Sequence, residues 1–269
     1  MTRLSKSGID YAHGGDRGDG KERIGYRWNF WTGCSNTACP CRADCWALAM
    51  CRRFGWAEKP CMVPDYRLRL NAPLDMANPA RFLVNFISDF FDAQIDGEHR
   101  LEIWRRVLHC PQHQFIFLTK QYAAAERFFG ERAVLPNVWV GASACNYESA
   151  EAGLLALRRV SEKGWHTWLS LEPLIDSGFA VYPVRAGMVA GAIEWIVIGA
   201  LSRNGRTVPP DRGGTRPEGI GLILVLAPDC KVGVWLKSNL EPIIRQVIDP
   251  RTGEPFASTK DWQDPIGGA

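Results

Sequence analysis

The sequence predicts an α/β fold in which six or seven parallel strands form a partial or complete (β/α) barrel of the TIM type. From Tyr26 onward, short apolar runs alternate with longer amphipathic segments, which is the pattern of repeated βα units. The 269 residues suit a single barrel of about 250 residues. A composition of 46% hydrophobic and 23% charged residues excludes a disordered or collagen-like chain.

Three segments of different composition divide the chain. Residues 1–25 are polar and rich in glycine, which predicts an irregular N-terminal arm. Residues 26–248 carry the alternating pattern and are expected to form one barrel domain. Residues 249–269 are again rich in proline and glycine, and we expect them to form a C-terminal surface extension.

The expected strands are runs enriched in aromatic and β-branched residues, which favour an extended backbone. Each run lies between polar or glycine-containing stretches that predict turns. In chain order, the strands are expected at residues 26–33, 82–89, 114–120, 137–143, 168–172, 194–200 and 232–237.

The expected helices lie between these strands. Residues 42–54 have Ala, Leu and Met in their middle, and these residues favour helix. Residues 99–108 repeat apolar residues at helical spacing, and Gly164 stands where the helix over 149–163 should end. Two further helices are expected at residues 122–129 and 217–227.

Charge and hydropathy exclude some classes of protein. The formal net charge of +3 does not by itself indicate nucleic-acid binding. No stretch approaches the roughly 18 apolar residues of a membrane span, and the N-terminus lacks the apolar core of a signal peptide. We therefore expect a cytoplasmic protein without a membrane partner, in the host cytoplasm if a phage encodes it.

Polar side chains follow the predicted strands at their carboxyl ends, where parallel α/β folds bind ligands. Glu172 shares one face of its strand with Ser170, while Leu169 and Leu171 share the other face. Glu172 is thus expected to point into the barrel, where it either acts on a ligand or forms a salt bridge with Lys120 or Lys237. We call the edge formed by these carboxyl ends the rim; its other polar residues include Ser88, Asp89, Ser143, Asn146 and Arg203.

Nine cysteines are present, and Cys34, Cys39, Cys41 and Cys45 crowd the loop after the first strand. If the first helix begins near Cys41, then Cys41 and Cys45 lie one turn apart and face the same centre. Thiolates select zinc or iron–sulfur clusters, so the spacing leaves a four-cysteine zinc site and a three-cysteine cluster open. Three cysteines on a [4Fe-4S] cluster would leave one iron free to bind a small molecule at the edge where substrates bind. The enzymes that cleave S-adenosylmethionine use a cluster of this kind.

Several phrases of the sequence, in this order, resemble a known family: WNFWTGC, a three-cysteine loop ending in CW, FISDFF, FIFLTK, NVWVGAS, LSLEPLI, WIVIGA and VWLKSNL. The chain is similar over residues 26–240 to a phage-associated three-Cys-motif family of uncharacterised proteins with radical SAM-like barrels, distantly similar to spore photoproduct lyase. The resemblance implies a barrel of the radical SAM type in which Cys34, Cys41 and Cys45 hold a [4Fe-4S] cluster. Three residues separate Cys41 from Cys45 where relatives commonly have two, and Cys39 is an additional candidate ligand.

The radical SAM picture also implies roles for the polar rim. Ser88 and Asp89 would receive the methionine amino group of S-adenosylmethionine, although Asp89 is equally well explained as a turn or helix-capping residue. Ser143 and Asn146 would bind its ribose. We expect Glu172 and Lys237 to be the catalytic residues.

A basic loop leaves the sixth predicted strand on the same rim. Arg203 and Arg206 are its first two arginines, and arginine side chains bind phosphate well. A solvated surface loop is the alternative interpretation. The position of the loop favours a DNA or nucleotide substrate, and enzymes that modify a base in duplex DNA flip it into a pocket.

The sequence therefore predicts a radical SAM enzyme that modifies, isomerises or rearranges a nucleobase, with thymidine-derived bases of phage DNA as the expected substrate. Such an enzyme needs an external electron donor as a partner. Two alternatives remain: a non-enzymatic nucleic-acid-binding protein with a structural zinc or iron–sulfur site, and a DNA repair enzyme resembling spore photoproduct lyase.

Overall fold

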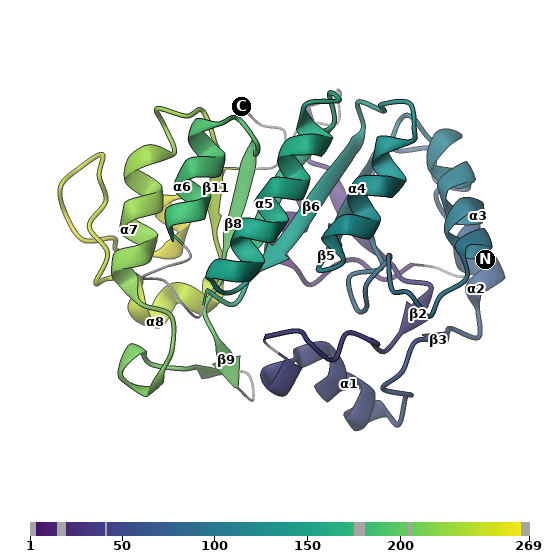
Figure 1. Cartoon of the computed structure of the whole chain (residues 1–269), viewed down its shortest axis with the longest axis horizontal. Helices are drawn as coiled ribbons and strands as arrows, with labels where there is room; N and C mark the ends of the chain where they lie inside the picture. Colours follow the sequence, from purple (N-terminus) through teal and green to yellow (C-terminus); the bar gives the residue numbers. More distant parts are fainter. Residues whose placement is uncertain (1–3, 15–19, 41, 175–180, 204–205, 265–269) are drawn as a thin grey trace.

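The computed structural model describes residues 4–14, 20–40, 42–174, 181–203 and 206–264. At its centre, a curled parallel sheet of seven strands forms a half-barrel (Figure 1). The spatial order of the strands is also their order along the chain, as in a barrel and unlike a doubly wound sheet. The strands are β1 (Ile24–Trp28), β4 (Ala80–Val84), β5 (Gln114–Thr119), β6 (Val138–Ala144), β7 (His166–Leu171), β8 (Trp195–Ile198) and β11 (Gly233–Leu236).

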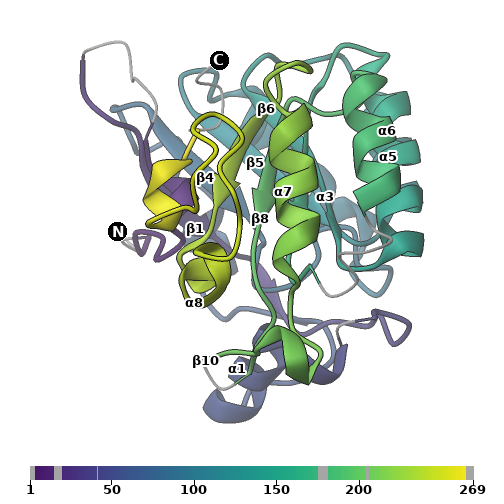
Figure 2. The ribbon, with the colours of Figure 1, turned by 90° about the vertical axis from the view of Figure 1, so that its left-hand side faces the viewer.

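Helices cover the outer face of the sheet (Figure 2). Leu169 and Leu171 of β7 belong to the large apolar core beneath them, whereas Trp168 points to the concave face. No helix in the described ranges is long and apolar enough to cross a membrane. The covering helices are α3 (Gly97–Leu108), α4 (Tyr122–Gly130), α5 (Tyr147–Ser161), α6 (Val181–Val189) and α7 (Pro217–Leu226).

The N-terminal arm fills the amino-terminal part of the concave face. Tyr11 is 3% exposed and packs against Trp168 and Trp195, with ring centroids 6.1 and 5.6 Å apart. The buried Arg81 of β4 donates to the main-chain oxygens of Tyr11, Ala12 and His13 at 3.3 Å each. The arm is therefore part of the core, although its composition predicts only irregular structure.

The first predicted strand divides into two elements. β1 ends at Trp28, and Trp31–Thr32 forms β2, which pairs antiparallel with β3 (Cys61–Met62). The Oδ1 atom of the buried Asn85 accepts hydrogen bonds from the main-chain nitrogens of Phe30 and Trp31, at 2.8 and 3.2 Å. These bonds replace sheet pairing and turn the chain out of the half-barrel.

The remaining elements differ from expectation in a few places. The first helix, α1 (Trp46–Phe54), begins four residues later than predicted, after a 3₁₀ turn over Arg42–Asp44. Helix α6 was not expected, because its valines, alanine and glycine give no clear amphipathic pattern. The other short elements are α2 (Tyr66–Leu70), α8 (Glu241–Ile244), β9 (Ser202–Arg203) and β10 (Arg206–Thr207).

The C-terminal segment folds back onto the edge strand β11 (Figure 2). Trp235 and Gln263 form an antiparallel bridge, and the Trp195 indole nitrogen donates to the main-chain oxygen of Asp264 at 2.8 Å. Phe256 and Trp262 are almost fully buried. The segment covers an edge that would otherwise expose unpaired backbone groups.

Candidate functional site

The loop that carries the cysteines lies beyond the carboxyl ends of the strands, beside α1 and the β9–β10 hairpin (Figures 1 and 2). It begins at Gly33, whose φ of 79° favours glycine. A Cβ atom at Gly33 would collide with the main-chain oxygen of Lys59. The Cys34 main-chain nitrogen donates to the Glu58 oxygen at 2.8 Å, so the loop entrance is held against the segment before β3.

The loop after β4 also holds the cysteine loop. The Ser88 hydroxyl donates to the main-chain oxygen of Gly33. The Asp92 carboxylate accepts from the main-chain nitrogen and the hydroxyl of Ser35, at 2.7 and 2.6 Å. Ser88, predicted to contact a cofactor, thus lies directly beside the cysteine loop and helps to shape it.

Two of the three predicted metal ligands are among the described residues. Burial raises the pKa of the half-buried Cys34 thiol, and nearby Asp92, Asp89 and Cys45 raise it further. Cys45 therefore lies within electrostatic reach of Cys34. Cys41 lies outside the described residues.

The first helix does not begin near residue 41, as the spacing of the cysteines had led us to expect. Cys45 is the N-cap residue of α1, because the helix begins only at Trp46. The helix therefore includes only residues after Cys45 and does not support the expected one-turn spacing of two ligands. Within the described ranges, which leave out residue 41, no group of three or more His, Cys, Asp or Glu side chains is arranged to hold a metal ion.

Glu172 and Lys237, the two predicted catalytic residues, form an ion pair on the concave face at the carboxyl ends of the strands. Their side chains are 25% and 19% exposed. Gly199 lies between them, and a Cβ atom there would lie 3.1 Å from Glu172 Cγ and 3.2 Å from Lys237 Cδ. The Lys237 ammonium group also lies 5.9 Å from the ring centroid of Tyr11, so the pair rests on the N-terminal arm.

Two serines on neighbouring strands extend this polar surface. Ser143 of β6 and Ser170 of β7 are paired in register. The Lys120 ammonium group donates to the Ser143 hydroxyl at 2.8 Å. The Ser170 hydroxyl is buried and has no hydrogen-bond partner among the described residues. A buried hydroxyl without a partner is rare, which makes Ser170 a candidate ligand-binding group that the sequence did not single out as such.

Asp89 and Asn146 are engaged in local structure. The buried Asp89 carboxylate accepts from the Thr119 hydroxyl and from the main-chain nitrogens of Lys120 and Phe91, within 2.7 to 2.9 Å. Asn146 caps α5 by accepting from the Ser149 main-chain nitrogen at 3.1 Å. These contacts favour the turn interpretation for Asp89 and give Asn146 a capping role that we did not predict; the cofactor roles predicted for both remain predictions.

The two arginines of the basic loop sit on the β9–β10 hairpin as cross-strand partners. Arg203 forms a two-pronged ion pair with Asp44 of the cysteine loop, at 2.8 and 3.0 Å. This pair lowers the pKa of Asp44 and links segments 159 residues apart. Arg206 is exposed on the neighbouring strand, where it is accessible to phosphate.

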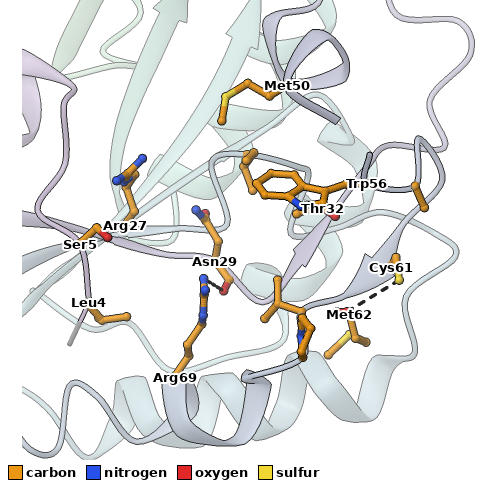
Figure 3. A pocket seen from close by; sticks show the side chains of 14 residues that line it. Leu4, Ser5, Arg27, Asn29, Thr32, Met50, Trp56, Cys61, Met62 and Arg69 are labelled. Carbon is orange, nitrogen blue, oxygen red and sulfur yellow. Dashed lines mark hydrogen bonds between the residues drawn. The ribbon is translucent and has the colours of Figure 1, made fainter. Parts of the chain in front are cut away.

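A cavity of about 450 Å³ opens beside the cysteine loop (Figure 3). It lies between the edge strand β1, residues 4 and 5 of the arm, and α1. Its polar lining includes Arg27, Asn29 and Thr32. No sequence pattern indicates this cavity, since its walls come from separate segments within the first 87 residues.

Comparisons with known proteins identify one family. No curated protein and no solved structure matches the chain. The family model described as "Protein of unknown function (DUF5131)" matches residues 22–211, which include the cysteine loop, strands β1 to β8 and the β9–β10 hairpin. Because this match covers well over half of the 269 residues, the chain belongs to the DUF5131 family.

Proposed function

We propose that this protein is a radical SAM enzyme that modifies a nucleobase in DNA or in a nucleotide, with thymidine-derived bases of phage DNA as its substrate. One observation carries the proposal. The cysteine loop follows the first strand of a singly wound parallel half-barrel and lies at the carboxyl edge, where such folds bind their ligands. The Glu172–Lys237 pair occupies the same edge.

The chemistry of the described cysteines fits an iron–sulfur cluster. Cys34 and Cys45 are half-buried thiols within electrostatic reach of each other, and thiolates are the usual ligands of such clusters. Cys45 stands at the N-terminus of α1, where the helix dipole favours an anionic group. The Arg42 guanidinium, which donates to the main-chain oxygen of Asn36 at 3.0 Å, adds positive charge to the loop. Cys41 would be the third ligand.

A [4Fe-4S] cluster with S-adenosylmethionine would supply a 5′-deoxyadenosyl radical at this edge. The residues of the chain would bind and orient the substrate. Glu172 and Lys237 present opposite charges to a polar substrate group, and the Ser170 hydroxyl offers both a donor and an acceptor. The aromatic layer of Tyr11, Trp168 and Trp195 closes the concave face below them and excludes water.

The test is anaerobic purification, reconstitution with iron and sulfide, and EPR of the reduced cluster with and without S-adenosylmethionine, with 5′-deoxyadenosine assayed in the same sample. We expect a spectrum that S-adenosylmethionine perturbs, and formation of 5′-deoxyadenosine. Cys34→Ala, Cys41→Ala and Cys45→Ala should each abolish both, and the matched control Cys39→Ala should retain both.

Three other outcomes would change the proposal. If Cys39→Ala alone loses the cluster, the ligand assignment is wrong. Tightly bound zinc with no effect of S-adenosylmethionine would reject the enzyme and favour a nucleic-acid-binding protein with a structural zinc site. Product formation only with ultraviolet-damaged DNA would favour a repair enzyme that resembles spore photoproduct lyase.

A further inference from the structure

The cavity beside the cysteine loop has the size and lining of a small-molecule site. Its volume of about 450 Å³ lies within the range of about 300 to 1,000 Å³ that is usual for ligand pockets. Met50, Met62, Val63 and Ile87 give it apolar walls, and Trp56 stands at its side (Figure 3). A few polar groups among apolar walls are typical of sites that orient a ligand.

Asn29 lines this cavity and carries an unsatisfied hydrogen-bonding atom. The residue is 9% exposed, and its Oδ1 atom has no hydrogen-bond partner among the described residues. Figure 3 shows its side chain lying between Arg27 and Trp56. Because a buried acceptor without a donor costs free energy, this atom calls for a ligand that brings an N–H or O–H group.

Arg27 is the cationic group of the cavity that is available to an anion. Arg69 also lines the cavity, but it is engaged with the Asp65 carboxylate at 2.7 Å and with the Asn29 main-chain oxygen at 3.2 Å. Arg27 is exposed, and Figure 3 shows its guanidinium group across the cavity from Trp56. An anionic ligand group would therefore lie at the Arg27 side.

Trp56 presents an aromatic surface to the same space. Its indole stacks on Phe54, with ring centroids 5.1 Å apart and an interplanar angle of 28°. The indole is 42% exposed and lines the cavity. Tryptophan rings exposed in this way bind nucleobases by stacking, which tolerates any base.

We infer that this cavity binds a nucleotide. Its base stacks on Trp56 and its phosphate pairs with Arg27, while a rotation of the Asn29 side chain brings the covered Oδ1 acceptor to an N–H group of the base. A thymine base suits the amide well, because its imide offers one donor beside acceptors. The inference rests on the proposed function for its biological meaning: Thr32 lines the cavity and Gly33 begins the cysteine loop, so a bound base would lie next to the proposed radical centre.

The test is titration of the whole chain with dTMP, in which tryptophan fluorescence and calorimetry measure the binding affinity. Thymidine and inorganic phosphate are titrated separately as probes of the base and of the phosphate. Trp56→Ala should weaken dTMP binding about ten-fold or more, from the loss of stacking. Asn29→Leu should weaken it about ten-fold while leaving the melting temperature unchanged or higher, because leucine removes an unsatisfied buried acceptor. Arg27→Ala should weaken binding of dTMP but not of thymidine.

Matched controls are Tyr182→Ala, an exposed aromatic on α6, and Arg127→Ala, an exposed arginine on α4, which should bind dTMP like the unchanged protein. Wild-type affinity in both Asn29→Leu and Trp56→Ala would overturn the inference, as would the absence of dTMP binding at millimolar concentration. Binding of phosphate alone with equal affinity would also overturn it.

Binding and S-adenosylmethionine cleavage are separate readouts. Binding of dTMP without cleavage would reject the proposed enzyme and keep the nucleotide site. Cleavage without dTMP binding would reject the site and keep the enzyme.

Discussion

Tyr11→Ala is the substitution that best tests the role of the N-terminal arm. The Tyr11 ring is 3% exposed and lies against Trp168 and Trp195, with centroid separations of 6.1 and 5.6 Å. Removing a buried aromatic ring costs about 3 to 5 kcal/mol, of which each aromatic contact contributes about 0.5 to 1.5 kcal/mol. We expect a loss of about 3 kcal/mol, because the open edge of the half-barrel lets the arm relax into part of the space.

The free energy of unfolding is measured by urea denaturation. Tyr182→Ala is the control, since this ring is 64% exposed on α6 and its loss should change stability by no more than about 0.5 kcal/mol. A loss below about 1 kcal/mol for Tyr11→Ala would refute the conclusion that the arm is part of the core.

Tyr11→Phe tests the electrostatic environment of the same ring. Burial, and next the negative charge of Glu172, raise the pKa of the Tyr11 hydroxyl well above its usual 10.0. The folded protein therefore holds this proton where the unfolded chain releases it, so stability falls as the pH rises above about 10. Tyr11→Phe should remove that part of the pH dependence, which unfolding measured between pH 9 and 11 would show.

Three further predictions concern the polar contacts of the carboxyl edge. Lys237→Met leaves the mostly buried Glu172 carboxylate unpaired and should lower the free energy of unfolding by about 1 to 3 kcal/mol. The double variant with Glu172→Gln should recover much of this loss. If the losses of the two single variants simply add in urea unfolding, the two side chains do not interact. Arg203→Ala should return the lowered pKa of Asp44 toward 3.8, as measured by carboxyl NMR. In the unchanged protein the ion pair stabilises the fold above pH 3.8, and this stabilisation is lost as the pH falls through the lowered pKa of Asp44. If the pKa of Asp44 is the same in the variant, the ion pair is not its cause. Asp89→Asn places an amide among donors from three residues and should cost about 2 to 4 kcal/mol in thermal unfolding, whereas a neutral effect would leave room for a ligand role.

The sequence by itself determined the parallel sheet. Strands buried on both faces appear in a sequence as short continuous apolar runs. Both ends of each of the strands β5 to β8 accordingly lie within two residues of the predicted ends. Alternation along β7 also placed Glu172 on the concave face, because successive side chains point to opposite sides of a strand. These features depend on neighbours in sequence, which a pattern can report.

Only the tertiary structure decided which residues meet. Lys237 rather than Lys120 pairs with Glu172, because Gly199 after the intervening strand β8 has no side chain to separate them, whereas the Lys120 ammonium group donates to the Ser143 hydroxyl. Tyr11 belongs to the core, although its segment has the composition of an irregular arm. The Asn29 cavity likewise forms from segments far apart in sequence, and long-range contacts of this kind leave no periodic trace in the chain that makes them.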